Sequence, residues 1–171
     1  MKKRPDFISI GYISKAHGIK GEVAITPVTD EPQQFETLHD VLLKNNNGQR
    51  RSVTIEKGKV RGNKIIVKFA GIDDRDEALA LKDAIIEKRI EDCEPLPHDQ
   101  YYIFDLIGLK VYTTQKLYLG EIKEVLSLTA NDVYVVQDGE KELLIPAIKN
   151  VIKKIDLNQE IVLIDPIDGL L

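Results

Sequence analysis

The sequence has no tryptophan and only one cysteine, Cys93, among its 171 residues. A single cysteine forms no disulfide within the chain, and no zinc-type ligand spacing surrounds it, so a structural thiol in a reducing compartment is expected. No run of about 18 or more apolar residues exists, which excludes a membrane-spanning helix. The basic start is followed by no small-residue cleavage site, so we expect no export signal and a cytoplasmic protein.

Catalytic motifs are absent as well. Neither of the glycine-rich phosphate loops, G-x-x-x-x-G-K-[ST] and G-x-G-x-x-G, occurs, and no G-x-S-x-G nucleophile elbow exists. The three histidines, His17, His39 and His98, are isolated from one another, so they lack metal-ligand spacing. The sequence therefore predicts a binding protein with no enzymatic activity, no cofactor and no bound metal.

Charge is divided unevenly along the chain, although the net charge is only −4. Residues 1–93 contain 17 Lys/Arg against 15 Asp/Glu, and residues 94–171 contain 7 against 13. All six arginines lie in the first part, and guanidinium groups suit phosphate recognition. The acidic second part would repel RNA and attract a basic protein. Chance segregation over an ordinary solvated surface is the alternative.

The segment Glu94–Asp99 contains two prolines and three charged or titratable residues. This composition resists both helix and sheet and suits a linker. We therefore predict two domains, residues 1–93 and 100–171, joined by a linker at 94–99. Many short segments of alternating apolar residues, spaced about ten residues apart, favour barrels or sandwiches over βαβ units. The predicted fold class is mostly β, with two small β-barrels as the expected form.

Strands are expected where apolar alternation is bounded by turn-forming or charged residues. In the first domain they are Phe7–Ser14, Glu22–Pro27, Val41–Lys44, Ser52–Glu56, Ile65–Phe69 and Ala84–Ile90. In the second domain they are Ile107–Tyr112, Tyr118–Leu128, Asp132–Val136, Leu143–Ile145 and Ile161–Ile164. The clearest hairpin turn is Asn45–Gly48, and Asp73-Asp74 precedes a short capped helix at Arg75–Lys82.

A loop in the first domain carries donors suited to phosphate. Residues 16–22 read AHGIKGE, and the two glycines permit a tight reversal. His17 and Lys20 could present donors from this loop to phosphate or carbonyl oxygens. A plain hairpin turn with a packed histidine is an equally compatible interpretation.

The densest basic stretch lies between residues 50 and 68. Its members are Arg50, Arg51, Lys57, Lys59, Arg61, Lys64 and Lys68. Alternation along strands would put several of them on one face, where they would neutralise phosphates with a salt-dependent affinity. A solvated face that protects an edge strand is the alternative interpretation.

Three aromatic residues, Tyr101, Tyr102 and Phe104, follow the predicted linker. Such a cluster either fills the seam at a domain boundary or anchors a partner, because tyrosine combines apolar area with a polar tip. In strand geometry two adjacent tyrosines point to opposite sides, so one is expected in the core while the other remains available.

Several segments, taken in order, carry a resemblance to a known family. They are Gly11–Ile13, Ala16–Val23, Thr29–Pro32, Asp76–Lys82, Tyr101-Tyr102, Asp105–Gly108, Gly120–Ile122, Asn131–Val133, Leu144–Ala147 and Asp168–Leu171. Their order and spacing, over nearly the whole chain, resemble the bacterial RimM family of ribosome maturation factors, also called 16S rRNA processing proteins.

The resemblance implies an N-terminal barrel similar to those of translation factors and a C-terminal PRC-type barrel. Members of the family bind free or immature 30S subunits rather than mature 70S ribosomes, contact small-subunit ribosomal protein nineteen, and assist folding of the 16S rRNA head domain. The family's paired tyrosines determine subunit binding, and they correspond to Tyr101 and Tyr102. With Asp105, these tyrosines are the predicted partner-binding residues.

The residues and the resemblance together predict an assembly factor that works by differential binding, since a ligand with equal affinity for two states shifts no equilibrium. The expected partners are ribosomal protein nineteen, the immature 30S subunit and 16S rRNA, and the protein is expected to be a monomer. The candidate rRNA contacts are His17, Lys20, Arg50, Arg51 and Arg61. A stand-alone RNA-binding module that uses the basic stretch is the alternative function.

Overall fold

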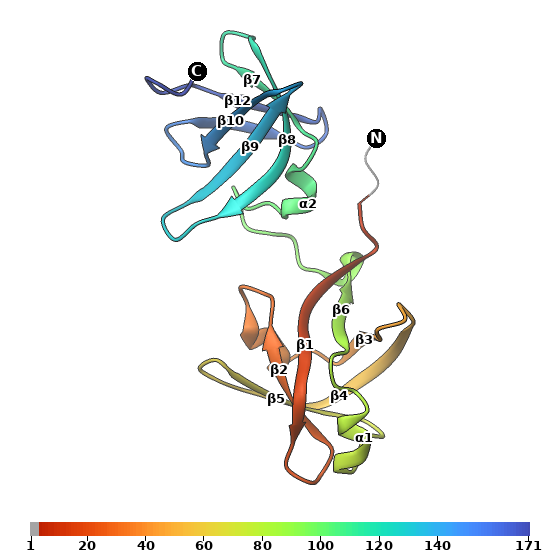
Figure 1. Ribbon diagram of the computed structural model, residues 1–171. Coiled ribbons are helices and arrows are strands. Elements are labelled where there is room, and N and C mark those ends of the chain that lie inside the picture. The colour runs from red at the N-terminus through yellow and green to blue at the C-terminus, as the bar shows by residue number, and fades with distance from the viewer. Residues whose placement is uncertain (1–3) are drawn as a thin grey trace. The chain divides into compact units, whose positions relative to one another are not determined.

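Strands dominate the computed structural model, which describes residues 4–171 (Figure 1). The chain divides into two units: the first spans Pro5–Glu94, and the second comprises Pro95–Leu171 together with Arg4. Residues 94–102 form neither helix nor strand. Within residues 4–171, no helix is long and apolar enough to cross a membrane. The predicted mostly β fold class is confirmed.

The first unit is a closed antiparallel barrel. Its elements are β1 (Phe7–His17), β2 (Glu22–Pro27), the 3₁₀ helix η1 (Pro32–Glu36), β3 (Asp40–Lys44), β4 (Arg50–Arg61), β5 (Lys64–Phe69), α1 (Arg75–Leu79), β6 (Ile85–Arg89) and the 3₁₀ helix η2 (Ile90–Asp92). The strand order is β1-β2-β5-β4-β3-β6, and β6 pairs with β1 to close the barrel. Closure means that every strand has a neighbour on both sides.

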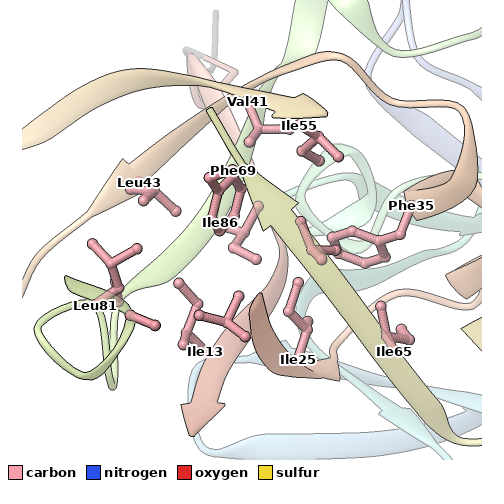
Figure 2. Packing of buried hydrophobic residues seen from close by; sticks show 14 of the residues in the cluster. Ile13, Ile25, Phe35, Val41, Leu43, Ile55, Ile65, Phe69, Leu81 and Ile86 are labelled. Atoms are coloured by element: carbon pink, nitrogen blue, oxygen red, sulfur yellow. The ribbon is translucent and has the colours of Figure 1, made fainter. Parts of the chain in front are cut away.

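Side chains fill the interior of this barrel. Ile13 of β1, Phe35 of η1 and Phe69 of β5 are completely buried, and Figure 2 shows them converging with side chains from the other strands. The other labelled members of the cluster are Ile25, Val41, Leu43, Ile55, Ile65, Leu81 and Ile86. Burial of each large apolar side chain contributes roughly 1.5–3 kcal/mol, so the inward alternation holds the strands in one register.

Local hydrogen bonds fix two connections of the barrel. Asp74 caps α1 because its side chain accepts from the Glu77 N–H at 2.8 Å. The side-chain oxygen of Asn45 accepts from the N–H groups of Asn47 and Gln49, each at 3.0 Å. The predicted helix cap and the predicted hairpin turn are both confirmed.

The second unit is a six-stranded sheet with its own core. Its elements are α2 (Ile103–Leu106), β7 (Lys110–Thr113), β8 (Tyr118–Ser127), β9 (Asp132–Asp138), β10 (Lys141–Pro146), β11 (Ile152–Asp156) and β12 (Ile161–Ile164). The strand order is β10-β9-β8-β7-β12-β11, and β12 and β7 are parallel. Ile122, Val136 and Ile145 are completely buried at the centre of its apolar cluster.

The largest differences from the predicted strands are in β4 and β11. β4 runs through Arg50–Arg61 rather than Ser52–Glu56, because a bulge between Ile55 and Lys57 shifts the alternation without ending the strand. β11 is not predicted by the sequence pattern, since adjacent charged residues interrupt its apolar alternation. It pairs with β12 through a register shift.

The aromatic segment after residue 100 is not a strand. Tyr102 stands immediately before the short helix α2, and the strand predicted to begin at Ile107 begins at Lys110. Gly108, with φ of 87°, turns the chain between them. Helix α1 likewise ends three residues before the predicted Lys82 because turns follow it, one with Asp83 at φ 68°.

Candidate partner-binding and RNA-binding surfaces

Aromatic side chains gather at the start of the second unit. The rings of Tyr102 and Phe104 are stacked, with centroids 5.0 Å apart and planes inclined by 8°. Tyr101 packs against the core of this unit, whereas Ile103 in the first position of α2 is exposed. The two adjacent tyrosines therefore occupy different environments, one at the core and one in a partly exposed aromatic stack.

Arg4 contacts this segment from the opposite end of the sequence. Its Nε and Nη2 donate to the two carboxylate oxygens of Asp105 at 2.8 and 2.7 Å. The same guanidinium lies 5.7 Å from the centroid of the Phe104 ring. A bidentate pair fixes the orientation of both groups, so Arg4 and Asp105 hold the Phe104 ring, and with it the stacked Tyr102 ring.

Asp105 is a predicted partner-binding residue whose carboxylate already has an intramolecular partner. Its side chain is only 10% exposed, while that of Arg4 is 56% exposed. A carboxylate in this position displays little of its charge to an external molecule. Its structural effect is on the neighbouring aromatic rings.

Tyr134 of β9 supports the aromatic segment from inside the unit. Its side chain is buried, and burial, with smaller effects of Asp132 and Tyr101, raises the pKa of Tyr134 to about 12. The phenol is therefore neutral at physiological pH. A neutral ring at this position is compatible with the apolar environment on which Tyr101 packs.

The loop with His17 and Lys20 is the turn between β1 and β2. Gly18 and Gly21 have φ values of 65° and 82°, in agreement with the predicted tight reversal. A Cβ on Gly21 would overlap a backbone carbonyl that precedes α1, and Arg75 of α1 donates to the Gly18 carbonyl at 3.0 Å. Lys20 is exposed at the tip, whereas His17 is half-buried at the end of β1.

Arg50, a predicted rRNA contact, neutralises a buried carboxylate. Its Nε donates to Glu87 at 2.6 Å, and its guanidinium lies 4.4 Å from the centroid of the Phe7 ring. Glu87 is 4% exposed. The hydrogen bond to Glu87 and the charge of that carboxylate raise the pKa of Arg50. Loss of Arg50 would leave a buried charge uncompensated, which is strongly destabilising.

Arg51 lies on the other face of β4, opposite the buried Leu43 of β3. It lines a hollow of about 770 Å³ together with Lys82 and the asparagines of the β3–β4 turn. Within residues 4–171, neither Arg51 nor Lys82 has an ion-pair partner. The two cations are therefore available to an anion from solvent.

Arg61 is at the far end of β4, opposite Lys64 of β5. Along the strand it is roughly 30 Å from Arg51, at a rise of about 3.3 Å per residue. The five predicted rRNA contacts thus lie at three different turns, β1–β2, β3–β4 and β4–β5. The structure does not bring them together as one site.

One residue of the aromatic site was missed in the sequence. Arg4 pairs with Asp105, but no local pattern marks an ion pair between residues 101 positions apart. The pairing of cations within the predicted basic stretch could also have been identified, because the two-residue turn Gly62-Asn63 predicts a register in which Arg61 faces Lys64.

Comparison with known proteins places both units in one family. The model of the RimM N-terminal domain matches residues 8–92, and the model of the RimM PRC barrel domain matches residues 103–170. The chain belongs to the RimM family. Tyr101 and Tyr102 stand directly before the first matched residue of the RimM PRC barrel domain.

Proteins named ribosome maturation factor RimM are similar to this chain along its length. The one from Thermoanaerobacter sp. (strain X514) is 39% identical, covering 96% of this chain and 99% of the relative. That of Dehalococcoides mccartyi (strain CBDB1) is 41% identical and covers 97% of each. That of Clostridioides difficile (strain 630) is 36% identical, covering 100% of this chain and 99% of the relative. The resemblance found in the sequence is confirmed over both units.

Proposed function

We propose that this protein is a cytoplasmic maturation factor that binds the free or immature 30S subunit and small-subunit ribosomal protein nineteen. It assists 16S rRNA processing and assembly of the 30S head, and it does so by binding rather than by catalysing a reaction. Membership of the RimM family supports the proposal, since relatives along the full chain carry the name ribosome maturation factor.

The observation that carries the proposal is the aromatic stack of Tyr102 and Phe104, fixed by the Arg4–Asp105 pair. Tyrosine and other large aromatic residues dominate the binding energy of protein interfaces. Rings that are already held in one orientation lose little conformational entropy when a partner binds. The exposed Ile103 adds apolar area beside them.

Charge in the second unit favours a basic partner. Its described residues, Arg4 and 95–171, contain 12 acidic and 8 basic residues, a net charge of −4. A negative surface accelerates the encounter with a positively charged protein and disfavours RNA. The second unit is accordingly the proposed site for the basic ribosomal protein.

An assembly factor must also leave the finished particle. A ligand shifts an equilibrium only by its difference in affinity for the two states. The proposed mechanism therefore requires tighter binding to the immature 30S particle than to the 70S ribosome, in which the binding surface has changed or is covered.

Co-sedimentation of the purified full-length protein with immature 30S particles and with 70S ribosomes tests this mechanism. We expect binding to the immature particle and none to the 70S ribosome. Tyr102→Ala should weaken the binding roughly 30-fold, since an interface anchor contributes about 2 kcal/mol or more. Equal sedimentation with both particles contradicts the proposal.

The matched control is Tyr118→Ala, which removes a tyrosine from another aromatic pair in the same unit. Tyr118 is 39% exposed, and its ring centroid is 5.3 Å from that of Tyr112. This variant should bind like the unchanged protein. Tyr102→Leu keeps most of the apolar volume, so it remains informative if Tyr102→Ala lowers the melting temperature. Wild-type binding by a folded Tyr102→Leu variant would rule out the aromatic anchor.

A further inference from the structure

An array of cations covers the outer face of the β4–β5 hairpin. This outer basic face consists of Lys57, Lys59, Arg61, Lys64 and Lys68. The residues that alternate with the cations of β5, Ile65 and Val67, are buried in the barrel core with exposures of 1% and 0%. Alternation therefore directs all five cations to the same side of the sheet.

The register places like charges directly opposite one another. Lys57 faces Lys68, and Arg61 faces Lys64. Lys68 is neutralised by two carboxylates, because its Nζ lies 3.1 Å from an oxygen of Asp73 and 3.6 Å from an oxygen of Glu56. The other four cations have no ion-pair partner within residues 4–171, and residues 57–68 contain no Asp or Glu. Like charges in directly opposed positions destabilise a sheet.

Protection of an edge strand does not account for these cations. Both strands belong to a closed barrel, so neither is an edge strand. The 3₁₀ helix η1 packs against β4 beyond the bulge. A Cβ on Gly58 would overlap the Phe35 carbonyl, and the Glu36 side chain accepts from the Val60 N–H at 3.1 Å. The opposed cations of β4 and β5 therefore repel one another without protecting an edge. An anionic ligand would neutralise this repulsion.

We propose that the outer basic face binds the phosphate backbone of RNA. Cations at alternate positions lie about 7 Å apart along a strand, and the two strands are about 5 Å apart, which gives two parallel rows of charge. A phosphodiester backbone requires only such charges for binding. Contacts of this kind are independent of base sequence.

Other anionic partners fit this face less well. A protein partner is anchored by aromatic or apolar side chains, and a membrane surface by inserted apolar side chains. On the outer face of residues 57–68 the sole apolar residue is the half-buried Ile66. The inference rests on the proposed function for the source of the RNA, while binding to naked RNA is measurable without any ribosomal protein.

Fluorescence anisotropy of a short fluorescein-labelled single-stranded RNA, titrated with full-length protein over a salt series, tests the inference. Four phosphate contacts predict a slope of log K against log salt of about −3. Lys59→Gln with Arg61→Gln should reduce the slope by about 1.4 and weaken binding about 10-fold or more at low salt. The melting temperature of this variant should stay constant or rise, because repulsion within the hairpin is relieved.

Lys149→Gln with Lys153→Gln is the matched control, because both lysines are exposed in the second unit and the change of charge is the same. This control should bind RNA like the unchanged protein. An unchanged slope and affinity in the β4–β5 variant would overturn the inference. A loss of polyglutamate binding or of phosphatidylserine-vesicle binding that is larger than the loss of RNA binding would also overturn the inference.

Tyr102→Ala should leave naked-RNA binding unchanged, so failure of one proposal is distinguishable from failure of the other.

Discussion

The second unit should lose stability at alkaline pH because of the buried Tyr134. The pKa of Tyr134 is raised to about 12 by burial, whereas an unfolded tyrosine titrates near 10. The folded state retains the proton between these two values and the unfolded state loses it, so stability is complete below about pH 10 and decreases as the pH rises toward 12. The loss should amount to roughly 1–3 kcal/mol.

Tyr134→Phe removes this titrating group, so its free energy of unfolding should fall less steeply between pH 10 and pH 12 than that of the unchanged protein. Urea unfolding followed by far-ultraviolet circular dichroism over that range measures the difference. Tyr118→Phe is the control, since Tyr118 is 39% exposed. Parallel pH profiles for unchanged and Tyr134→Phe proteins would contradict the prediction.

Individual charged residues show what a sequence pattern leaves open. Arg50 and Arg51 are adjacent, chemically identical, and both line the hollow beside the β3–β4 turn, yet Arg50 neutralises the buried Glu87 whereas Arg51 has no ion-pair partner within residues 4–171. Their roles differ because they lie on opposite faces of β4, and because the partner of Arg50 comes from a strand 37 residues further along the chain. A pattern of basic residues indicates an RNA contact for both.

At the scale of secondary-structure elements, the Arg4–Asp105 pair should position the aromatic rings at the start of α2. Arg4→Ala removes both hydrogen bonds and the contact with Phe104. We expect a change in the near-ultraviolet circular dichroism of the tyrosine and phenylalanine bands, which no tryptophan obscures. Because Arg4 is largely exposed, the loss of stability should be small, about 1 kcal/mol.

Binding of the Arg4→Ala variant to immature 30S particles should weaken while its far-ultraviolet spectrum stays the same. Arg4→Lys keeps the charge but not the bidentate geometry, so it should restore binding only in part. Arg89→Ala, which disrupts a 3.8 Å contact between exposed Arg89 and Glu91, is the control. If Arg4→Ala leaves the near-ultraviolet spectrum and the binding unchanged, the pair does not position the rings.

Regular alternation made most strands of both units predictable, and the failures have local physical causes. β4 is longer than predicted because its bulge reverses the phase of alternation in mid-strand. The aromatic segment has strand-like composition but forms a helical turn, held by an arginine that no neighbouring residue reveals. Of the candidate sites, the paired tyrosines and the basic stretch were visible in sequence, whereas their supporting contacts were not.

At the scale of the whole molecule, two surfaces of opposite character lie in different units. The outer basic face belongs to the first unit and the aromatic stack to the second. Binding sites joined by one chain raise each other's effective concentration when both engage the same target. Because the two sites share no residues, mutations in them should contribute independently to the free energy of binding.

Combining Lys59→Gln and Arg61→Gln with Tyr102→Ala tests this independence on immature 30S particles. Losses of about 10-fold and about 30-fold should multiply to about 300-fold, because independent free energies add. Raising the salt concentration should abolish the effect of the two β4 substitutions and preserve that of Tyr102→Ala, because screening acts on exposed charges rather than on apolar contact. If the combined variant binds no more weakly than Tyr102→Ala alone at low salt, the outer basic face does not contact the particle.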